Sequence, residues 1–226
     1  MEIMKKPTSP QKLSSSPDLN PIMLPTPTKG RSKSVISALH ERRTDRTIGD
    51  KKLSLQMLSN LLWSSRGINR SAGPFGVPGS TAASASNAQE IQVYVAMVQG
   101  CYLYHPDKHI LDKVTNEDLR ALAIGKGQGS LGSTAPVRLI YVVDIDKFKS
   151  AGFQEPGLED PETQKAYYYV DTGLIAGNVY LFCSSQGLSA WFHNCQKQTL
   201  ATKLKLGTQQ RVLFAQTVGY PDLVAE

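Results

Sequence analysis

Hydrophobic and polar residues recur along this chain in periods that predict several helices. Ser34 stands before a stretch with apolar residues at helical spacing and predicts the start of a short helix. Ser54 does the same for a second helix. The second helix carries leucines at three- and four-residue spacing, with Gly67 just past its end. A third helix is expected to begin at Thr115, where two acidic residues would complement the first turn and Leu119 would face inward.

Runs of β-branched and other apolar residues predict the strands. Residues 91–98 read as a strand, and residues 101–104 follow as its hairpin partner or continuation. Residues 137–144 are largely apolar, which is typical of a central strand, and residues 211–218 form the last strand that the pattern predicts. Residues 71–87 are rich in Gly, Ala, Ser and Pro, and we expect a loop there.

Residues 166–185 are apolar almost all round and contain one charged residue, Asp171. This length predicts a helix, and a helix without a polar face lies in a core or an interface. Gly173 and Gly177, four residues apart, would let another backbone approach closely. Helices outnumber strands in this pattern and no strand–helix unit repeats, so it predicts an α+β fold with helices packed around a small mixed sheet.

The beginning of the chain differs from the rest in composition. Six of the 13 prolines fall before residue 28, and such a segment buries too little apolar area to offset the entropy of ordering. We therefore expect residues 1–31 to form a basic arm, disordered or draped over the surface, and residues 32–226 to form one domain. The formal charge is +6, but residues 1–33 hold +4 of it. A nucleic-acid-binding domain would carry its basic face within the folded part.

Length and cysteine content narrow the class further. A chain of 226 residues can bury a sufficient core without disulfides or metals. Apolar runs of about 18 residues are absent from the sequence, and the Lys5-Lys6 pair leads into a Pro-rich stretch, so we expect neither a membrane span nor a secretory signal. The three cysteines show no paired spacing, which favours core thiols and a reducing, cytoplasmic compartment.

One cluster of residues is suited to binding a phosphate group. Arg42, Arg43, Thr44 and Arg46 place three guanidiniums and a hydroxyl within five residues, directly after the first predicted helix. The planar guanidinium bonds phosphate oxygens in pairs and keeps its charge. A solvated helix end, whose arginines interact with the helix dipole, explains the same residues equally well, and the cluster alone leaves both open.

Other motifs carry less chemistry. Residues 127–132 match G-x-G-x-x-G, but the strand follows the motif instead of preceding it, which favours a plain flexible loop. His105 and His109 flank a Pro-Asp turn without a third ligand at a familiar spacing, so no metal site is expected. No convincing set of acid, base and nucleophile can be assembled around Cys195 or elsewhere. This indicates a binding protein, or an enzyme whose cofactor holds the reactivity.

Several individually weak motifs occur in one order between about residues 34 and 221. They are the Arg42–Arg46 segment, residues 53–63, residues 67–70, the Ser/Ala-rich turn at 81–88 with its strand, the hairpin at 102–105, Ala135-Pro136, the Gly-containing helix at 173–182, and residues 186–188. In this order they resemble the FMN-dependent nitroreductases, closest to the branch with thiazole- and oxazole-forming dehydrogenases. The resemblance implies helices around a mostly antiparallel sheet and an intertwined homodimer with two flavins in its interface.

The resemblance also assigns residues to the cofactor. Those that would hold the phosphate and ribityl chain of FMN are Arg42, Arg43, Thr44 and Arg46. Those that would approach the isoalloxazine from the partner subunit are Ser84, Ala85, Ser86 and Asn87. Asn194 and Cys195 lie where family members offer a backbone N–H to the flavin N5.

The activity implied by the resemblance is that of an NAD(P)H oxidoreductase. Hydride would pass from the nicotinamide to flavin N5 and on to a nitroaromatic or quinone-like acceptor in a ping-pong cycle. One alternative is a flavin-binding protein or ring-oxidising dehydrogenase without NAD(P)H reductase activity. The other is binding of nucleic acid or another anionic partner through the arm, whereas the favoured function requires neither nucleic acid nor a membrane.

Overall fold

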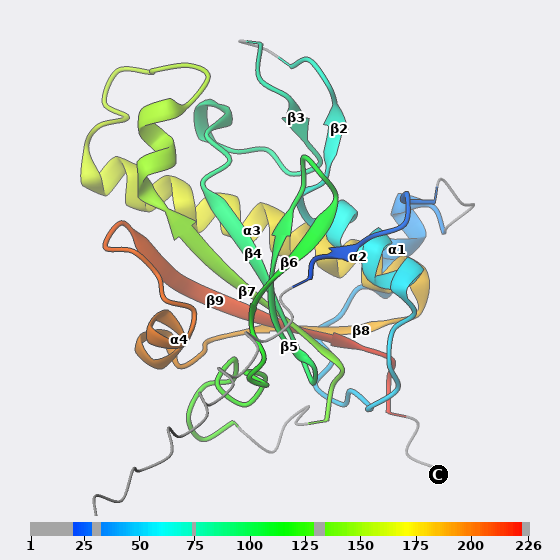
Figure 1. Ribbon diagram of the computed structural model, residues 1–226. Coiled ribbons are helices and arrows are strands. Elements are labelled where there is room, and N and C mark those ends of the chain that lie inside the picture. The colour runs from blue at the N-terminus through cyan, green and yellow to red at the C-terminus, as the bar shows by residue number, and fades with distance from the viewer. Residues whose placement is uncertain (1–19, 29–32, 74–75, 129–133, 223–226) are drawn as a thin grey trace, which may run out of the picture.

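The computed structural model describes residues 20–28, 33–73, 76–128 and 134–222 (Figure 1). One sheet holds seven strands in the order β1-β6-β5-β4-β7-β9-β8, and all neighbours in it are antiparallel. These strands are β1 (Ile22–Met23), β4 (Ile91–Met97), β5 (Gly100–His105), β6 (Ile110–Thr115), β7 (Val137–Asp144), β8 (Ser189–His193) and β9 (Gln210–Gly219). A separate ribbon pairs β2 (Ile68–Arg70) with β3 (Gly79–Ser80).

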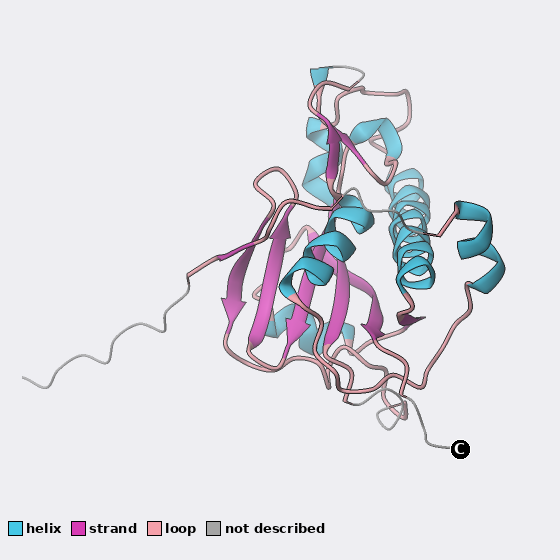
Figure 2. Cartoon of the chain, turned by 90° about the vertical axis from the view of Figure 1, so that its right-hand side faces the viewer, coloured by secondary structure: helices cyan, strands magenta, loops and turns pink. Residues whose placement is uncertain are grey.

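Helices flank this sheet (Figure 2). The α-helices are α1 (Val35–Glu41), α2 (Leu55–Arg66), α3 (Pro161–Gln186) and α4 (Lys197–Lys203), and the 3₁₀ turns are η2 (Ala85–Asn87) and η3 (Ile145–Ser150). Within the described residues, no helix combines the length and the apolar character that crossing a bilayer requires.

The sheet separates two hydrophobic cores. Leu139 on β7 packs in the core that contains α2 and α3, whereas its neighbour Ile140 points into the core that contains Leu200 of α4. Successive side chains of a strand face opposite sides, so a strand covered on both faces needs apolar residues throughout. This explains the nearly continuous apolar sequence of β7, which lies between β4 and β9 as a central strand, as predicted.

The predicted helix boundaries at Ser34, Ser54 and Gly67 are confirmed. Ser34 and Ser54 cap α1 and α2 by accepting backbone N–H groups with their side chains, and Gly67 is the C-cap of α2. The long apolar segment is α3, which extends from its N-cap Asp160 to Gly187, where a φ of +67° ends the helix.

The helix predicted from Thr115 is wrong, because residues 110–115 form β6 and the chain then turns. The N–H of Glu117 donates to Thr115 Oγ1 at 3.2 Å, and the N–H of Arg120 donates to Asp118 Oδ1 at 3.0 Å. These local side-chain acceptors stabilise turns in competition with a helix. Leu119 is nevertheless buried, as the apolar pattern indicated.

The sheet is larger than the sequence suggested, because β1, β6 and β8 were not predicted and strands outnumber helices among the described residues. The α+β class, with helices around a mostly antiparallel sheet, is confirmed. Part of the predicted arm, residues 20–28, lies along the domain: Ile22 and Met23 pair with β6, and Gln56 of α2 donates to the carbonyl oxygen of Thr26 at 3.0 Å. The rest of the arm before residue 20 lies outside the described residues.

Candidate functional site

The segment after α1 is fixed to β8 through Asp45. Its N–H donates to the carbonyl oxygen of Ala190 at 3.0 Å, and the hydroxyl of Ser189 donates to its carboxylate at 2.6 Å. The N–H of Thr47 reaches the other carboxylate oxygen at 3.0 Å. Asp45 therefore holds the backbone in place, and the side chains on either side of it are left to meet a ligand.

Those side chains are Arg42, Arg43, Thr44 and Arg46, which we call the arginine clamp; all four are exposed. The guanidinium of Arg42 lies 5.4 Å from the ring centre of Tyr180 on α3, and that of Arg46 lies 5.5 Å from the ring centre of Trp191 on β8. Thr44 Oγ1 is 3.1 Å from the hydroxyl of Tyr180. Such cation–π contacts orient a guanidinium without using its N–H donors.

The charges of the clamp are available to an anion. Within the described part of the chain, no carboxylate forms an ion pair with Arg42, Arg43 or Arg46. A pocket of about 420 Å³ opens beside Arg42 and Arg43, and it is also lined by Glu41, Asp45, Tyr180, Ser184 and residues 187–190. Unpaired guanidiniums beside a hollow favour phosphate binding over a merely solvated helix end.

The turn from Ser84 to Gln89 has an unusual backbone. Ser86, Asn87 and Gln89 have φ values of +50°, +54° and +51°, a backbone conformation that residues other than glycine adopt rarely. The N–H of Ala85 donates to the carboxylate of Asp171 on α3 at 2.9 Å, and the N–H of Gln89 donates to Ser84 Oγ at 3.0 Å. Strain of this kind persists where surrounding contacts enforce it, and it is typical of functional sites.

Asn194 and Cys195 follow β8 directly and line a hollow with residues 125–128. The N–H of Cys195 donates to Asn194 Oδ1 at 2.9 Å, so a ligand that takes this donor must displace the amide side chain. His193 Nδ1 lies 2.9 Å from the carbonyl oxygen of Asn194, and its Nε2 lies 2.8 Å from Thr217 Oγ1. Because a carbonyl only accepts, Nδ1 carries the proton and donates it to Asn194.

Burial determines the ionisation of the two titratable groups beside Asn194. It lowers the pKa of His193 to about 4, an effect that nearby Arg138 strengthens and the Asn194 carbonyl opposes. It raises the pKa of the Cys195 thiol to about 11. The histidine is therefore neutral and the thiol protonated near pH 7. These states are typical of core residues, whereas a Cys–His nucleophile needs a thiolate.

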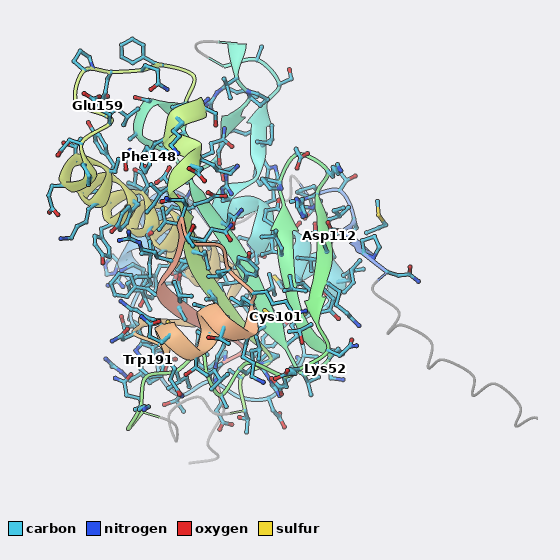
Figure 3. All side chains as sticks on the ribbon, turned by 60° about the vertical axis from the view of Figure 1, so that its left-hand side comes forward. Lys52, Cys101, Asp112, Phe148, Glu159 and Trp191 are labelled. Carbon is cyan, nitrogen blue, oxygen red and sulfur yellow. The ribbon has the colours of Figure 1, made fainter. Side chains whose placement is uncertain are left out.

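One chain brings only some of the predicted site residues together. The segment that carries the clamp is bound to β8 by the hydrogen bond from the Asp45 N–H to Ala190. Asn194 lies four residues beyond Ala190, which is about 13 Å in an extended strand. The Ser84–Gln89 turn is attached to Asp171, nine residues or about 14 Å along α3 from Tyr180. Figure 3 shows Trp191 at the opposite end of the molecule from Phe148 and Glu159. The turn lies toward that far end, because Ser86 Oγ donates to Glu155 at 3.2 Å.

Several residues of the site were not predicted. Tyr180 and Trp191 support the clamp, but nothing in the sequence distinguishes them from ordinary core aromatics. Asp171 did carry a signal, since it is the only charged residue in the apolar segment 166–185.

Comparisons of the sequence with known proteins give one family. A sequence model described as the nitroreductase family matches residues 39–220. A protein of Methanocaldococcus jannaschii that is named as a nitroreductase is 28% identical over 159 residues, which cover 66% of this chain and 73% of the relative.

Solved structures show the same fold. A protein of Ralstonia eutropha JMP134, also named as a nitroreductase, superimposes with a TM-score of 0.77 and 27% identity over 96% of both chains. A chain of the Escherichia coli microcin synthetase complex superimposes with a TM-score of 0.65 and 16% identity, covering 88% of this chain and 78% of that one.

Proposed function

The chain belongs to the nitroreductase family, and on this premise we propose that it is an FMN-dependent NAD(P)H oxidoreductase. Membership in the family supports a flavin-type oxidoreductase, and the finer assignment is our proposal. Bound FMN would supply hydride transfer at its N5, from a reduced nicotinamide to a nitroaromatic or quinone-like acceptor. The protein's own share is to bind, orient and electrostatically stabilise these groups.

The observation that carries the proposal is the arginine clamp. Its guanidiniums have no carboxylate partner among the described residues, two of them lie against aromatic rings, and a pocket of about 420 Å³ adjoins Arg42 and Arg43. These properties fit the phosphate of FMN, which would accept from Arg42, Arg43 and Arg46 and from the hydroxyl of Thr44. Asn194 and Cys195, about 13 Å along β8, would lie near the reactive ring.

The second half of the site would come from a second copy of the chain. The exposed face of α3 carries Tyr169, Val170 and Leu174, which are 41–58% exposed, and a Cβ built on Gly173 or Gly177 would meet open space. An apolar face with small residues suits helix packing against a partner. We propose that α3 is the centre of a homodimer and that Ser84, Ala85, Ser86 and Asn87 reach the flavin held by the partner subunit's clamp.

The proposal is tested by FMN binding to the double variant Arg42→Ala, Arg46→Ala. Each hydrogen bond to a charged group contributes about 1.5–3 kcal/mol, so loss of two weakens binding by at least about 150-fold. The matched control is Arg70→Ala, an exposed arginine on β2. Equal FMN affinity in the wild type and the double variant would refute the clamp assignment.

Turnover separates the proposal from its alternatives. Bleaching of the bound flavin by NADH or NADPH without oxygen supports the reductase, whereas retained FMN without bleaching supports a flavoprotein with another electron donor. Deleting residues 1–19 should leave FMN content unchanged. A protein that instead binds nucleic acid through the arm would lose that binding in the same deletion.

A further inference from the structure

Three ionisable side chains from three elements are buried beneath the Ser84–Gln89 turn. They are Arg66 at the end of α2, Glu90 just before β4, and Asp171 on α3, with exposed fractions of 5%, 0% and 4%. Together with Ser80 and Ser84 they line a hollow of about 10 Å³, the size of a single water molecule. Charged groups are rarely buried to this degree unless they are paired.

The hydrogen bonds of this cluster leave one group unsatisfied. Arg66 donates to the carbonyl oxygen of Gln89 at 3.0 Å, and Asp171 accepts the N–H of Ala85 at 2.9 Å. Both carboxylate oxygens of Glu90 are buried without a side-chain donor in the described part of the chain, and Glu90 lines the same small hollow as Asp171. Two ionised carboxylates beside one buried hollow of this size would repel each other, which favours a proton on one of them.

The surrounding charges indicate which group holds the proton. Burial and, after it, the neighbouring Asp171 carboxylate raise the pKa of Glu90 to about 8, whereas the positive charge of Arg66 opposes the shift. Burial also raises the pKa of Asp171, but the Ala85 N–H and the hydrogen bond from Glu90 lower it. Among the described residues, Lys147 on η3 is a further cation whose charge interacts with that of Glu90. Glu90 is therefore the acid, and Asp171, which accepts the Ala85 N–H, is the carboxylate.

The pair is joined to the strained turn at two points. Asp171 holds the Ala85 N–H, near the start of the turn, and Glu90 follows Gln89, its last left-handed residue. Ionising Glu90 would replace a hydrogen bond with repulsion between like charges. Separation of the two carboxylates would then move either end of a turn that only its contacts keep in place.

We propose that Glu90 and Asp171 share one buried proton and act as positioning residues for the Ser84–Gln89 turn. Asp171 does so by holding the Ala85 N–H, and Glu90 by keeping Asp171 in place through the shared proton. The inference rests on the proposed function in one respect, namely that this turn contacts the flavin. Flavin affinity then depends on a proton that never touches the flavin.

The test is the dissociation constant of FMN, measured by fluorescence quenching between pH 6.5 and 9.5. In the wild type, affinity should fall by up to about tenfold per pH unit above the midpoint of the pair, whereas Glu90→Gln keeps a neutral partner for Asp171 and should show no such fall. Asp171→Asn removes the neighbouring charge that raises the pKa of Glu90 and should move the fall to lower pH. The control Glu159→Gln changes an exposed carboxyl and should follow the wild type. Ionisation of the flavin itself would appear in all four proteins.

A second readout does not need the flavin. Thermal unfolding of the protein without FMN should show a midpoint that falls between pH 5 and pH 8 in the wild type and falls less in Glu90→Gln, because the folded state holds a proton that the unfolded chain releases. A protein that binds no FMN at any pH refutes the proposed function and leaves this measurement to decide on the pair. Parallel curves for the wild type and Glu90→Gln, in affinity and in unfolding alike, would overturn the inference.

Discussion

Replacing Tyr180 with Phe removes one oxygen atom at the point where α3, β8 and the arginine clamp meet. The N–H of Phe192 donates to this hydroxyl at 2.8 Å, and Thr44 Oγ1 lies 3.1 Å from it. Phe192 belongs to β8, the edge strand of the sheet, so no further strand is available for that N–H. The ring remains, and with it the contact to Arg42.

The expected loss can be worked out from these two contacts. A partly buried N–H left without an acceptor costs about 1–3 kcal/mol, and the more exposed bond to Thr44 adds at most about 1 kcal/mol. We expect a loss of about 2–3 kcal/mol in the free energy of unfolding. For a chain of this size, that lowers the unfolding midpoint by roughly 4–12 °C.

Urea unfolding at equal protein concentrations measures this loss. Tyr169→Phe is the matched control, because the hydroxyl of Tyr169 bonds to none of the described residues. FMN affinity should fall modestly in Tyr180→Phe, since Thr44 loses its support while Arg42 keeps its ring. A loss of less than about 0.5 kcal/mol, or one equal to that of the control, would refute the account of how α3 supports the clamp.

Three further predictions test neighbouring parts of the structure. The pKa of His193 is lowered to about 4, so acid favours the unfolded chain, and about 3 kcal/mol of stability should be lost between pH 6.5 and pH 4; urea titrations of His193→Gln should show a flatter profile. Asp45→Ala removes the acceptor of two donors and should cost about 1–3 kcal/mol of stability and weaken FMN binding, which calorimetry can measure. Val170→Lys combined with Leu174→Lys should yield monomers in sedimentation, with an unchanged circular dichroism spectrum.

Local signals were sufficient for the helices that begin and end at capping residues. Ser54 and Gly67 mark the ends of α2 because their contacts lie within four residues along the chain. The apolar sequence predicted most of α3, but its polar first residues, 161–165, were not included. β6 was missed because Asp112 and Lys113 interrupt its apolar residues and because the acidic turn after Thr115 resembles the first turn of a helix.

β8 was missed for a different reason. It is five residues long, and its place in the sheet depends on pairing with β9, about twenty residues further along the chain. A short strand of this kind is selected by its partner rather than by its own sequence, so one chain read alone gives little indication of it.

The same division between local and distant contacts holds for the candidate site. The arginine clamp could be predicted because its members are adjacent in sequence. Its supports, Tyr180 and Trp191, come from elements more than 130 residues away. The Glu90–Asp171 pair requires α3 to lie beside the start of β4, and no periodicity in the sequence indicates that contact.

The position of Gly173 and Gly177 on α3, between Asp171 and Tyr180, leads to a last prediction. In a two-fold symmetric dimer, antiparallel α3 helices crossing at these glycines would bring the turn held by one subunit toward the clamp of the other. Arg42→Ala with Arg46→Ala damages the clamp, and Asp171→Ala damages the support of the turn, so each variant alone should bind FMN poorly. Refolding the two variants together in equal amounts should restore tight binding at about a quarter of the sites, because half of the dimers are mixed and each of those has one intact site. Titration with FMN counts these sites, and if clamp and turn serve the same flavin within one subunit, mixing restores none of them.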